Sequence, residues 1–298
     1  HYAYLKIAEG CNKCCTYCII PKVRGNYRSI NEEEIINSAE KLVGNGAKEL
    51  ILVAQETTMY GVDIYGKKML PDLLKKLCKI SGLVWIRILY CYPEEITDEL
   101  IEVMKTETKI CKYIDMPIQH ASDNVLHEMG RRTNRAELIE RIEKIRKEIP
   151  DIVLRTTLIT GFPGETEEDF QIMRSFVDEM EFDRLGVFTY SPEEDTIAAE
   201  LPNQVDEEIK NKRRNDIMEL QQDIAFEKAD NMVGKTLLTM IEGKVVDENA
   251  YVGRTYMDSP NVDGNIFVTT DEELVTGDFV KVKVTGAVEY DLIGEICK

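Results

Sequence analysis

The feature that most constrains the fold is a regular alternation of short apolar runs and amphipathic helical stretches over residues 1–203. Most of the apolar runs lack a clean polar–apolar alternation, which is typical of parallel strands buried on both faces. Six consecutive β/α units therefore predict an α/β fold with a partial or complete TIM-type barrel. The predicted strands are Tyr4–Ala8, Glu49–Ala54, Val84–Tyr90, Tyr113–Met116, Val153–Thr160 and Leu185–Tyr190.

Capping residues mark three helix starts in this region. Asn31 with Glu34, and Asn134 with Glu137, have the spacing of capping boxes, and Thr166 is expected to cap a third helix. These residues mark where helices begin between the predicted strands.

The pattern of apolar and polar residues changes after residue 203. A polar, charged helix is expected around Gln204–Met232, either as a connector or as an outer helix packed on the barrel. After Gly234, short β-rich runs separated by Gly, Asp and Asn predict a small all-β barrel. We therefore expect domains at residues 1–203 and 233–298, joined by a helix at 204–232. The β-rich runs are Thr236–Glu242, Tyr251–Thr255, Asn265–Val268 and Val280–Thr285.

Composition limits the possible environments and partners. The 298 residues are 43 % hydrophobic and 31 % charged, which allows one large and one small domain. No apolar run approaches the ~20 residues of a membrane span, so no membrane partner is expected. The formal charge of −18 disfavours general nucleic-acid binding and suits a basic partner. Eight cysteines without a visible export signal predict a reducing, cytoplasmic location.

Three cysteines near the start indicate the chemistry. Cys11, Cys15 and Cys18 have the spacing C-x3-C-x2-C, with Tyr17 just before the last one. Three thiolates on one short loop suit a 4Fe–4S cluster with one open iron, where S-adenosylmethionine (SAM) could bind and be split reductively. A zinc site is the first alternative, but it normally takes four ligands and no second pair follows. Disulfides are unneeded in so core-rich a chain. Cys14 is expected to be a bystander, and the other four cysteines small buried hydrophobes.

Polar residues follow each of the other predicted strands. In α/β barrels the chemistry lies on the loops after the carboxyl ends of the strands, so these loops should converge with the cysteine loop on one mouth. Loops of this kind are generally polar, and any single residue could simply be solvated. The loop residues are Gln55–Thr58, Tyr90–Pro93, Pro117–His120, Gly161–Glu165 and Ser191–Glu193.

Polar candidates for SAM binding come from these loops and from one strand. The SAM amino group could donate to Gln55 or Glu56. The SAM carboxylate needs a cation, and Arg155 on a predicted inner strand is a candidate, although a salt bridge is an equal alternative. Gln119, at the end of the fourth predicted strand, is a further candidate for contact with SAM.

The adenine of SAM would need an apolar slot. Tyr17, Ile159 and the stretch after Phe188 could supply it. His120 could contact the ribose or the substrate, although a hydrogen-bonded structural histidine is the more common role.

Longer motifs around these residues resemble the radical-SAM methylthiotransferases over essentially the whole chain. They are Glu9-Gly10-Cys11 with Cys15 to Pro21, Arg24-Gly25 with Arg28-Ser29, Gln119 with Ser122 to Met129 and Arg131-Arg132, and Thr160 to Thr166. The resemblance implies that the C-terminal β-barrel is a TRAM domain. The resemblance also implies the activity: a 5′-deoxyadenosyl radical removes hydrogen from the substrate carbon, and a second SAM supplies the methyl of the methylthio group.

Two branches of this family differ in substrate. One modifies an adenosine of tRNA, and the other an aspartate β-carbon of small-subunit ribosomal protein S-twelve. The stretches Gln55–Asp63, Gly253–Pro260 and Glu289–Glu295 resemble the second branch. Charge agrees, because residues 233–298 hold 12 Asp and Glu against 6 Lys and Arg, a net −6, whereas a tRNA-gripping barrel should be basic. We therefore expect a basic ribosomal protein as partner, with tRNA the less favoured alternative.

One part of the family pattern is not found. The family carries an N-terminal domain whose three further cysteines hold a second 4Fe–4S cluster, and nothing in this sequence matches it. Because the chain also begins at His1, we expect it to be a shortened form of a longer protein. A low-potential electron donor is implied as a partner. A non-catalytic iron–sulfur or zinc module remains the alternative from a different functional class.

Overall fold

The computed structural model describes residues 1–246 and 248–297. Its larger part is a six-stranded sheet in which every neighbouring pair is parallel. Within the described residues β1 and β8 remain unpaired edges, so the predicted α/β fold is confirmed as a partial TIM-type barrel. In spatial order the strands are β1 (Tyr2–Lys6), β4 (Glu49–Val53), β5 (Trp85–Ile88), β6 (Ile110–Asp115), β7 (Val153–Thr160) and β8 (Arg184–Thr189).

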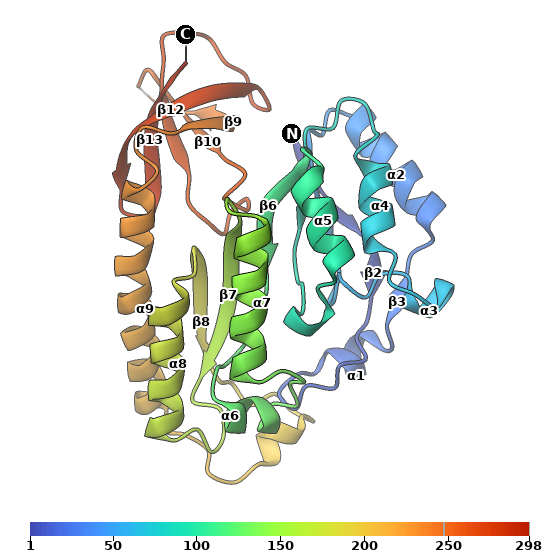
Figure 1. The fold of residues 1–298 in the computed structure, drawn as a ribbon, viewed down its shortest axis with the longest axis vertical. Helices are drawn as coiled ribbons and strands as arrows, with labels where there is room; N and C mark the ends of the chain where they lie inside the picture. Colours follow the sequence, from blue (N-terminus) through green and yellow to red (C-terminus); the bar gives the residue numbers. More distant parts are fainter. Residues whose placement is uncertain (247, 298) are drawn as a thin grey trace.

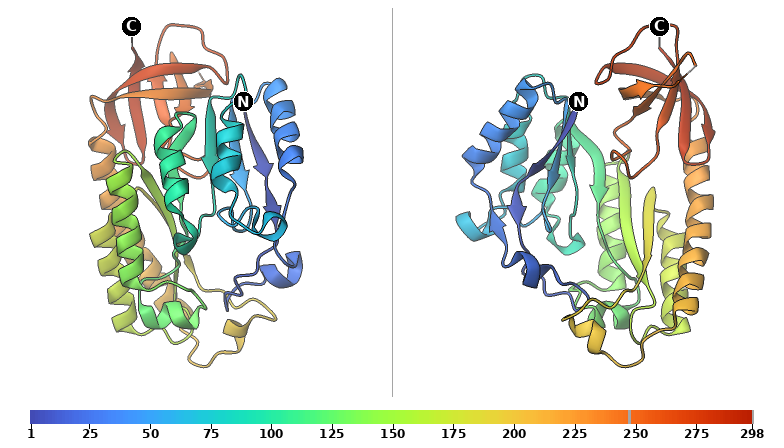
Figure 2. Two further views of the ribbon diagram at one scale, coloured as in Figure 1. Left: turned by 45° about the vertical axis from the view of Figure 1, so that its right-hand side comes forward. Right: turned by 180° about the vertical axis from the view of Figure 1, so that it is seen from behind.

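Helices connect these strands and cover the outer face of the sheet (Figures 1 and 2). The capping box of Asn134 and the cap of Thr166 are confirmed at the starts of two of them, and Thr166 also forms a capping box with Asp169 that was not predicted. Asn31 caps its helix through the amide of Glu33 rather than that of Glu34, so the prediction named the wrong partner. The helices are α1 (Ile20–Arg24), α2 (Glu32–Gly44), α3 (Val62–Tyr65), α4 (Leu70–Leu77), α5 (Asp98–Thr106), α6 (Asp123–Glu128), α7 (Arg135–Glu148) and α8 (Glu167–Met180).

The first predicted strand is divided in the structure. β1 ends at Lys6, and β2 (Ala8–Glu9) pairs antiparallel with β3 (Arg28–Ser29). This short pair closes the base of the loop that carries the cysteines. The loop therefore leaves the sheet at the carboxyl end of β1, as expected for a functional loop of this fold.

Helix α9 (Glu207–Asp230) packs along β8 and α8 (Figure 2). Two of its basic residues are buried against the sheet. Lys210 Nζ donates to the Tyr190 carbonyl at 2.9 Å, and Arg213 Nη1 pairs with Glu165 Oε1 at 2.8 Å. The predicted domain bounds at residues 203 and 232 stay a prediction.

The C-terminal part is a closed five-stranded barrel, which confirms the predicted all-β domain. Four strands match predicted runs, and β13 was not predicted. At Gly294 of β13 a Cβ atom would lie 2.4 Å from Val282 Cγ1, so only glycine fits this approach to β12. The strands are β9 (Thr236–Lys244), β10 (Ala250–Arg254), β11 (Ile266–Thr269), β12 (Phe279–Val288) and β13 (Asp291–Ile296).

The barrel lies against the amino ends of the parallel strands, opposite the end that carries the cysteine loop (Figure 1). Trp85, the first residue of β5, packs edge-to-face on Phe279 of β12, with ring centroids 4.8 Å apart. Glu49, the first residue of β4, accepts from Arg87 at 2.8 Å and from Arg254 of the barrel at 2.6 Å. These three charged side chains are buried, so the interface contains both an apolar contact and a dry ion-pair network.

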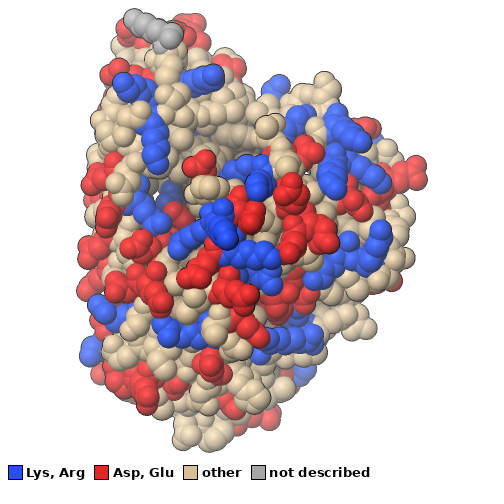
Figure 3. Space-filling model, in the orientation of Figure 1, with Lys and Arg blue, Asp and Glu red and all other residues tan. Residues whose placement is uncertain are grey.

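The surface carries both signs of charge. Figure 3 shows acidic and basic side chains interspersed on one face of the molecule rather than a basic stripe. No helix of the described residues combines the length and the apolar character needed to cross a membrane.

Candidate active site

The cysteine loop is fastened to the rest of the molecule by backbone hydrogen bonds. The amide of Cys11 donates to the Gly25 carbonyl at 3.2 Å, and the amide of Thr16 donates to the Met129 carbonyl at 3.0 Å. Gly10, with φ of +82°, starts the loop where a Cβ atom would lie 2.2 Å from the Asn26 carbonyl oxygen. The loop geometry therefore requires glycine at this position.

The three predicted ligands share this loop, and their thiols are free. Cys11 and Cys15 are each 7 % exposed, and Cys18 is half-buried. Cys14, in contrast, is exposed and has a left-handed backbone with φ of 56°, and its thiol donates to the Asn12 carbonyl. The exposure of Cys14 agrees with the expected bystander role.

The predicted donor set is three free thiols on one loop. Among residues 1–246 and 248–297, no group of three His, Cys, Asp or Glu side chains converges as a mononuclear metal site requires. Burial raises the pKa of both the Cys11 and Cys18 thiols. Three soft thiolates on one loop would hold a 4Fe–4S cluster and leave one iron open.

A pocket of about 380 Å³ lies beside the cysteines. Gln55 lines it, and its Oε1 accepts from the Gly10 amide at 2.7 Å, which ties the loop after β4 to the cysteine loop. The volume is within the range of small-molecule sites. The lining residues are Lys6, Ala8, Cys11, Cys18, Ile20, Val53, Ala54, Gln55, Tyr90 and Tyr92.

Glu56 lies in a second pocket of about 240 Å³ that Cys11 also lines. The side chain is 1 % exposed, and one carboxylate oxygen accepts from the Thr58 amide at 3.1 Å. The other oxygen, Oε2, has no hydrogen-bond partner in the described part of the chain. Burial raises the pKa of Glu56 to about 7, although the hydrogen bonds from Thr58 and the charge of Lys13 oppose the shift. Gln55 and Glu56 thus both lie beside the cysteine loop, as predicted from their place after a strand.

Cys15 has polar and cationic neighbours, of which Tyr92 belongs to a loop predicted to reach this mouth, whereas Arg131 and Lys13 were not predicted as site residues. The phenol oxygen of Tyr92 lies 3.7 Å from Cys15 Sγ, and the Arg131 guanidinium stacks over the Tyr92 ring at 4.2 Å. Lys13 Nζ lies 5.0 Å from the centroid of the same ring. Hydrogen bonds and cations around a ligating sulfur tune the potential of a cluster. The position of Tyr92 after a strand was the only signal in the sequence that could have identified it.

Tyr17 and Ile159, which were predicted to contribute to an apolar slot, lie in the same part of the molecule. Both pack against a small buried cluster that includes Phe162 and Tyr190. Tyr190 belongs to the stretch after Phe188, which was predicted to join them. Phe188 itself lies on the edge strand β8 and is 63 % exposed.

Gln119 lies near this cluster with a left-handed backbone, φ of 74°. Its amide donates to the Thr157 carbonyl at 2.9 Å, and its carbonyl accepts from the Ile159 amide at 2.8 Å. The side-chain oxygen is buried and has no partner among the residues that the structure describes. An amide oxygen in that state is a candidate acceptor for a ligand.

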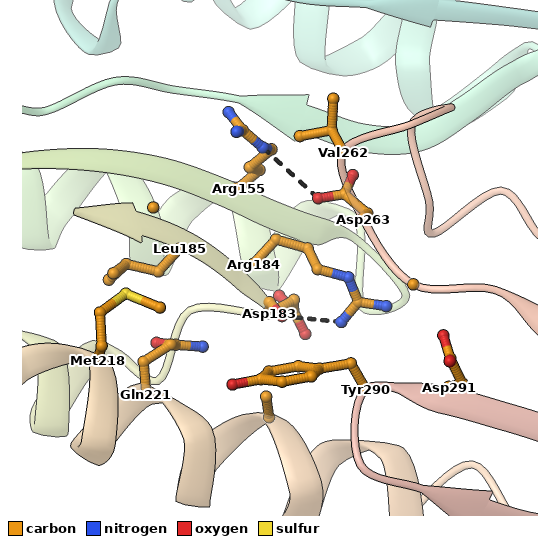
Figure 4. A pocket seen from close by; sticks show the side chains of 13 residues that line it. Arg155, Asp183, Arg184, Leu185, Met218, Gln221, Val262, Asp263, Tyr290 and Asp291 are labelled. Carbon is orange, nitrogen blue, oxygen red and sulfur yellow. Dashed lines mark hydrogen bonds and ion pairs between the residues drawn. The ribbon is translucent and has the colours of Figure 1, made fainter. Parts of the chain in front are cut away.

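Arg155 occupies a different place. It lines a pocket of about 400 Å³ between β8, α9 and the barrel, shown in Figure 4, and not the pocket beside the cysteines. Its Nη1 pairs with Asp115 Oδ1 at 2.8 Å, and its Nε lies 3.5 Å from Asp263 Oδ1 of the barrel. The salt-bridge alternative describes these contacts, and binding of the SAM carboxylate by Arg155 stays a prediction.

The Gly161–Glu165 turn contacts His120 and helix α9. His120 is fully buried, its Nδ1 accepts from the Ser122 amide at 2.9 Å, and its Nε2 lies 3.3 Å from Glu165 Oε2. A Cβ atom on Gly161 would lie 2.1 Å from Lys210 Cγ of α9. These contacts favour the structural role for His120, which stays a prediction, and the glycine admits a helix of the same chain.

Comparison with known proteins places these features in a family. Residues 5–177 match the radical SAM superfamily, and residues 233–297 match the TRAM domain. The chain is 64 % identical over 294 residues to the protein named ribosomal protein uS12 methylthiotransferase RimO of Lachnoclostridium phytofermentans, covering 99 % of this chain and 67 % of that protein. Proteins of the same name from Clostridium botulinum strain Hall and Clostridioides difficile strain 630 are 53 % and 52 % identical, and each is 66 % covered. The chain thus spans about two thirds of the length of these relatives.

Solved structures support the fold alone. Coproporphyrinogen III oxidase (HemN) of Escherichia coli superposes with a TM-score of 0.53 at 18 % identity, covering 78 % of this chain and 54 % of that one. Methylornithine synthase (PylB) gives 0.53 at 12 % identity, covering 74 % and 61 %. From the matched domains and the level of identity, the chain belongs to the radical SAM superfamily and, within it, to the RimO family.

Proposed function

We propose that this chain carries the radical-SAM core and TRAM barrel of an enzyme that adds a methylthio group to the β-carbon of an aspartate in ribosomal protein uS12. The observation that carries the proposal is 64 % identity over 99 % of the chain to a protein with that name. The free thiols of Cys11, Cys15 and Cys18 beside a pocket of suitable size support it independently.

Each group near the pocket has a defined task in this proposal. Cys11, Cys15 and Cys18 hold a 4Fe–4S cluster, which when bound supplies the electron that splits SAM and yields a 5′-deoxyadenosyl radical. Gln55 fixes the wall of the pocket through its bond to Gly10, and its amide can donate to SAM. The buried surroundings of Cys11 exclude water from the reacting groups.

The other predicted SAM contacts belong to the same proposal. Glu56 has an unsatisfied carboxylate oxygen, within the described residues, that can accept from the amino group of SAM. Tyr17 and Ile159 offer an apolar face for the adenine, and the side-chain oxygen of Gln119, which has no partner among residues 1–246 and 248–297, can accept from it. Contacts of Phe188 and Arg155 with SAM stay predictions.

The charge of the barrel supports a basic protein substrate. Residues 233–298 carry a net charge of −6 from 12 acidic and 6 basic residues. One of those cations, Arg254, is buried against Glu49 and cannot grip a phosphate. Such a surface favours encounter with a basic ribosomal protein over tRNA.

Further parts of the complete reaction lie beyond these residues in this proposal. A second cluster would draw its ligands from residues outside this sequence, because Cys78, Cys91 and Cys111 are each buried in the core and Cys297 is exposed on the barrel. A low-potential electron donor would reduce the first cluster. Eight free cysteines suit a reducing compartment such as the cytoplasm.

The test is to measure binding of the protein to uS12 and to tRNA at physiological salt, and then to analyse uS12 by mass spectrometry after reaction. We expect this chain to bind uS12 more tightly than tRNA. We expect the methylthio group on an aspartate of uS12 only when a protein that also holds the second cluster is supplied with SAM and a reductant. Tighter binding to tRNA would refute the substrate assignment.

A further inference from the structure

The loop between β10 and β11 reaches into the amino end of the open sheet. Two of its carboxylates form similar ion pairs with strand residues. Asp258 Oδ1 pairs with Arg184 Nη2 at 2.6 Å, and Asp263 Oδ1 lies 3.5 Å from Arg155 Nε. In both pairs the arginine side chain is 19 % and the carboxylate 3 % exposed, so the two contacts are equally shielded from solvent. Figure 4 shows Arg155, Arg184 and Asp263 around one pocket.

The two pairs differ in the second hydrogen-bond acceptor of the arginine. Arg155 also donates through Nη1 to Asp115 Oδ1 at 2.8 Å. The second oxygen of that carboxylate, Oδ2, accepts from the backbone amide of Tyr90 at 3.1 Å. Arg184 donates instead to its neighbour, the Asp183 carbonyl. Only the Asp263 pair therefore continues toward another segment of the sheet in the contacts of the described residues.

Tyr90 belongs to the wall of the pocket beside the cysteines. It lines that pocket, its carbonyl accepts from the Thr57 amide at 3.0 Å, and two residues later Tyr92 approaches Cys15. The backbone of Tyr90 is left-handed, with φ of 59°. A non-glycine residue in that conformation costs about 1–3 kcal/mol and persists only where its surroundings hold it. The hydrogen bond from the Tyr90 amide to Asp115 is one of the contacts that hold it.

We propose that Asp263 of the TRAM barrel is a positioning residue for this pocket wall, acting through Arg155 and Asp115. A guanidinium facing a single carboxylate favours a two-bond, fork-like pairing. Asp263 lies beside Nε of Arg155, so Arg155 donates to Asp115 only through Nη1. The Oδ2 atom of Asp115 therefore stays available to accept from the Tyr90 amide. Without the charge at 263, Arg155 turns both N–H groups to Asp115 and displaces the Tyr90 amide.

Asp263 is itself held rigidly. Its Oδ2 accepts from the Tyr113 hydroxyl at 2.7 Å and from the Ser259 amide at 2.8 Å. A fixed anchor of this kind gives the relay a defined geometry. The barrel thereby contributes to the opposite end of the sheet, in addition to any role in binding a partner; the link to SAM rests on the proposed function.

The test compares Asp263→Asn with Asp258→Asn, which removes the matched carboxylate from the same interface. Backbone amide exchange is measured in the full chain without cluster or SAM, after near-UV circular dichroism has shown both variants to be folded. We expect exchange at Tyr90 to be at least tenfold faster in Asp263→Asn and unchanged in Asp258→Asn. Equal acceleration in both variants, or none in either, overturns the proposal.

A second variant keeps the test decisive if Asp263→Asn fails to fold. Arg155→Lys leaves a single ammonium that cannot bridge two carboxylates in the same way, so Tyr90 exchange should again accelerate. The double variant Asp263→Asn with Arg155→Lys should exchange at Tyr90 little faster than either single variant, because both substitutions act on one chain of contacts. Additive effects of the two substitutions on Tyr90 exchange would overturn the proposed chain of contacts.

In the reconstituted protein we expect Asp263→Asn to raise the KM for SAM more than it lowers kcat. If no variant cleaves SAM but Tyr90 exchange responds as stated, the proposed function fails and the positioning role stands.

Discussion

Replacing Glu49 with Gln tests the ion-pair network between the sheet and the barrel. Glu49 is fully buried and bonded to Arg87 at 2.8 Å and to Arg254 at 2.6 Å. Removing one partner of a buried ion pair costs about 3–5 kcal/mol, because a charge is left without its counter-charge. Arg254 keeps Glu242 at 2.7 Å, and Arg87 keeps the carbonyl of Tyr256 at 2.8 Å. These remaining contacts place the expected loss at the lower end, about 3 kcal/mol.

The assay is urea unfolding followed by the fluorescence of Trp85. This is the only tryptophan of the sequence, and it contacts Phe279 across the same interface. With a slope of about 3 kcal/mol per molar urea, the midpoint should fall by about 1 M. The control is Glu148→Gln, which breaks an exposed pair with Lys105 and should leave the midpoint unchanged. A Glu49→Gln midpoint equal to that of the control would refute the reasoning.

Three further outcomes are expected. Burial alone would raise the pKa of Glu49, but the charges of Arg87 and Arg254 lower it. The stabilising contribution of the Glu49 carboxylate is therefore present above its ordinary pKa of 4.5 and is lost as the pH falls through the lower pKa of the folded state. The free energy of unfolding, measured between pH 3 and 6, should depend less on pH in Glu49→Gln. Gly10→Ala should abolish iron incorporation on reconstitution, because its Cβ meets a backbone carbonyl at 2.2 Å, whereas Gly164→Ala, with a similar φ but open space, should retain it; equal iron contents would contradict this. Thr166→Ala should lower the free energy of unfolding by about 1 kcal/mol through loss of the α8 cap, and an unchanged thermal midpoint would count against that role.

The strands of the sheet could be predicted because burial on both faces leaves a direct trace in the sequence. β4 (Glu49–Val53) is an almost continuous apolar run, and its bounds were predicted to within one residue. β13 could not be predicted in the same way. Its pairing with β12 depends on the close approach of Gly294 to Val282. This contact joins two separate segments, so the residues around Gly294 alone do not predict it.

In the site, too, some residues could be placed from the sequence and others could not. Cys11, Cys15 and Gln55 could be placed because a loop after a parallel strand has only one end of the sheet to occupy. Arg155 was correctly assigned to a strand, but its partners could not be foreseen, because Asp263 reaches it from another domain. The stretch Gly253–Pro260 was noted only as a family resemblance. In the structure it supplies Arg254 and Asp258 to the interface.

The central claim is that Cys11, Cys15 and Cys18 hold a cluster that splits SAM. Its most direct test is anaerobic reconstitution with iron and sulfide, followed by dithionite and SAM, with 5′-deoxyadenosine measured as the product. The account predicts about four irons and 5′-deoxyadenosine in the native chain, and loss of both in Cys15→Ala. A reconstituted chain that keeps its cluster intact but forms no 5′-deoxyadenosine would contradict it.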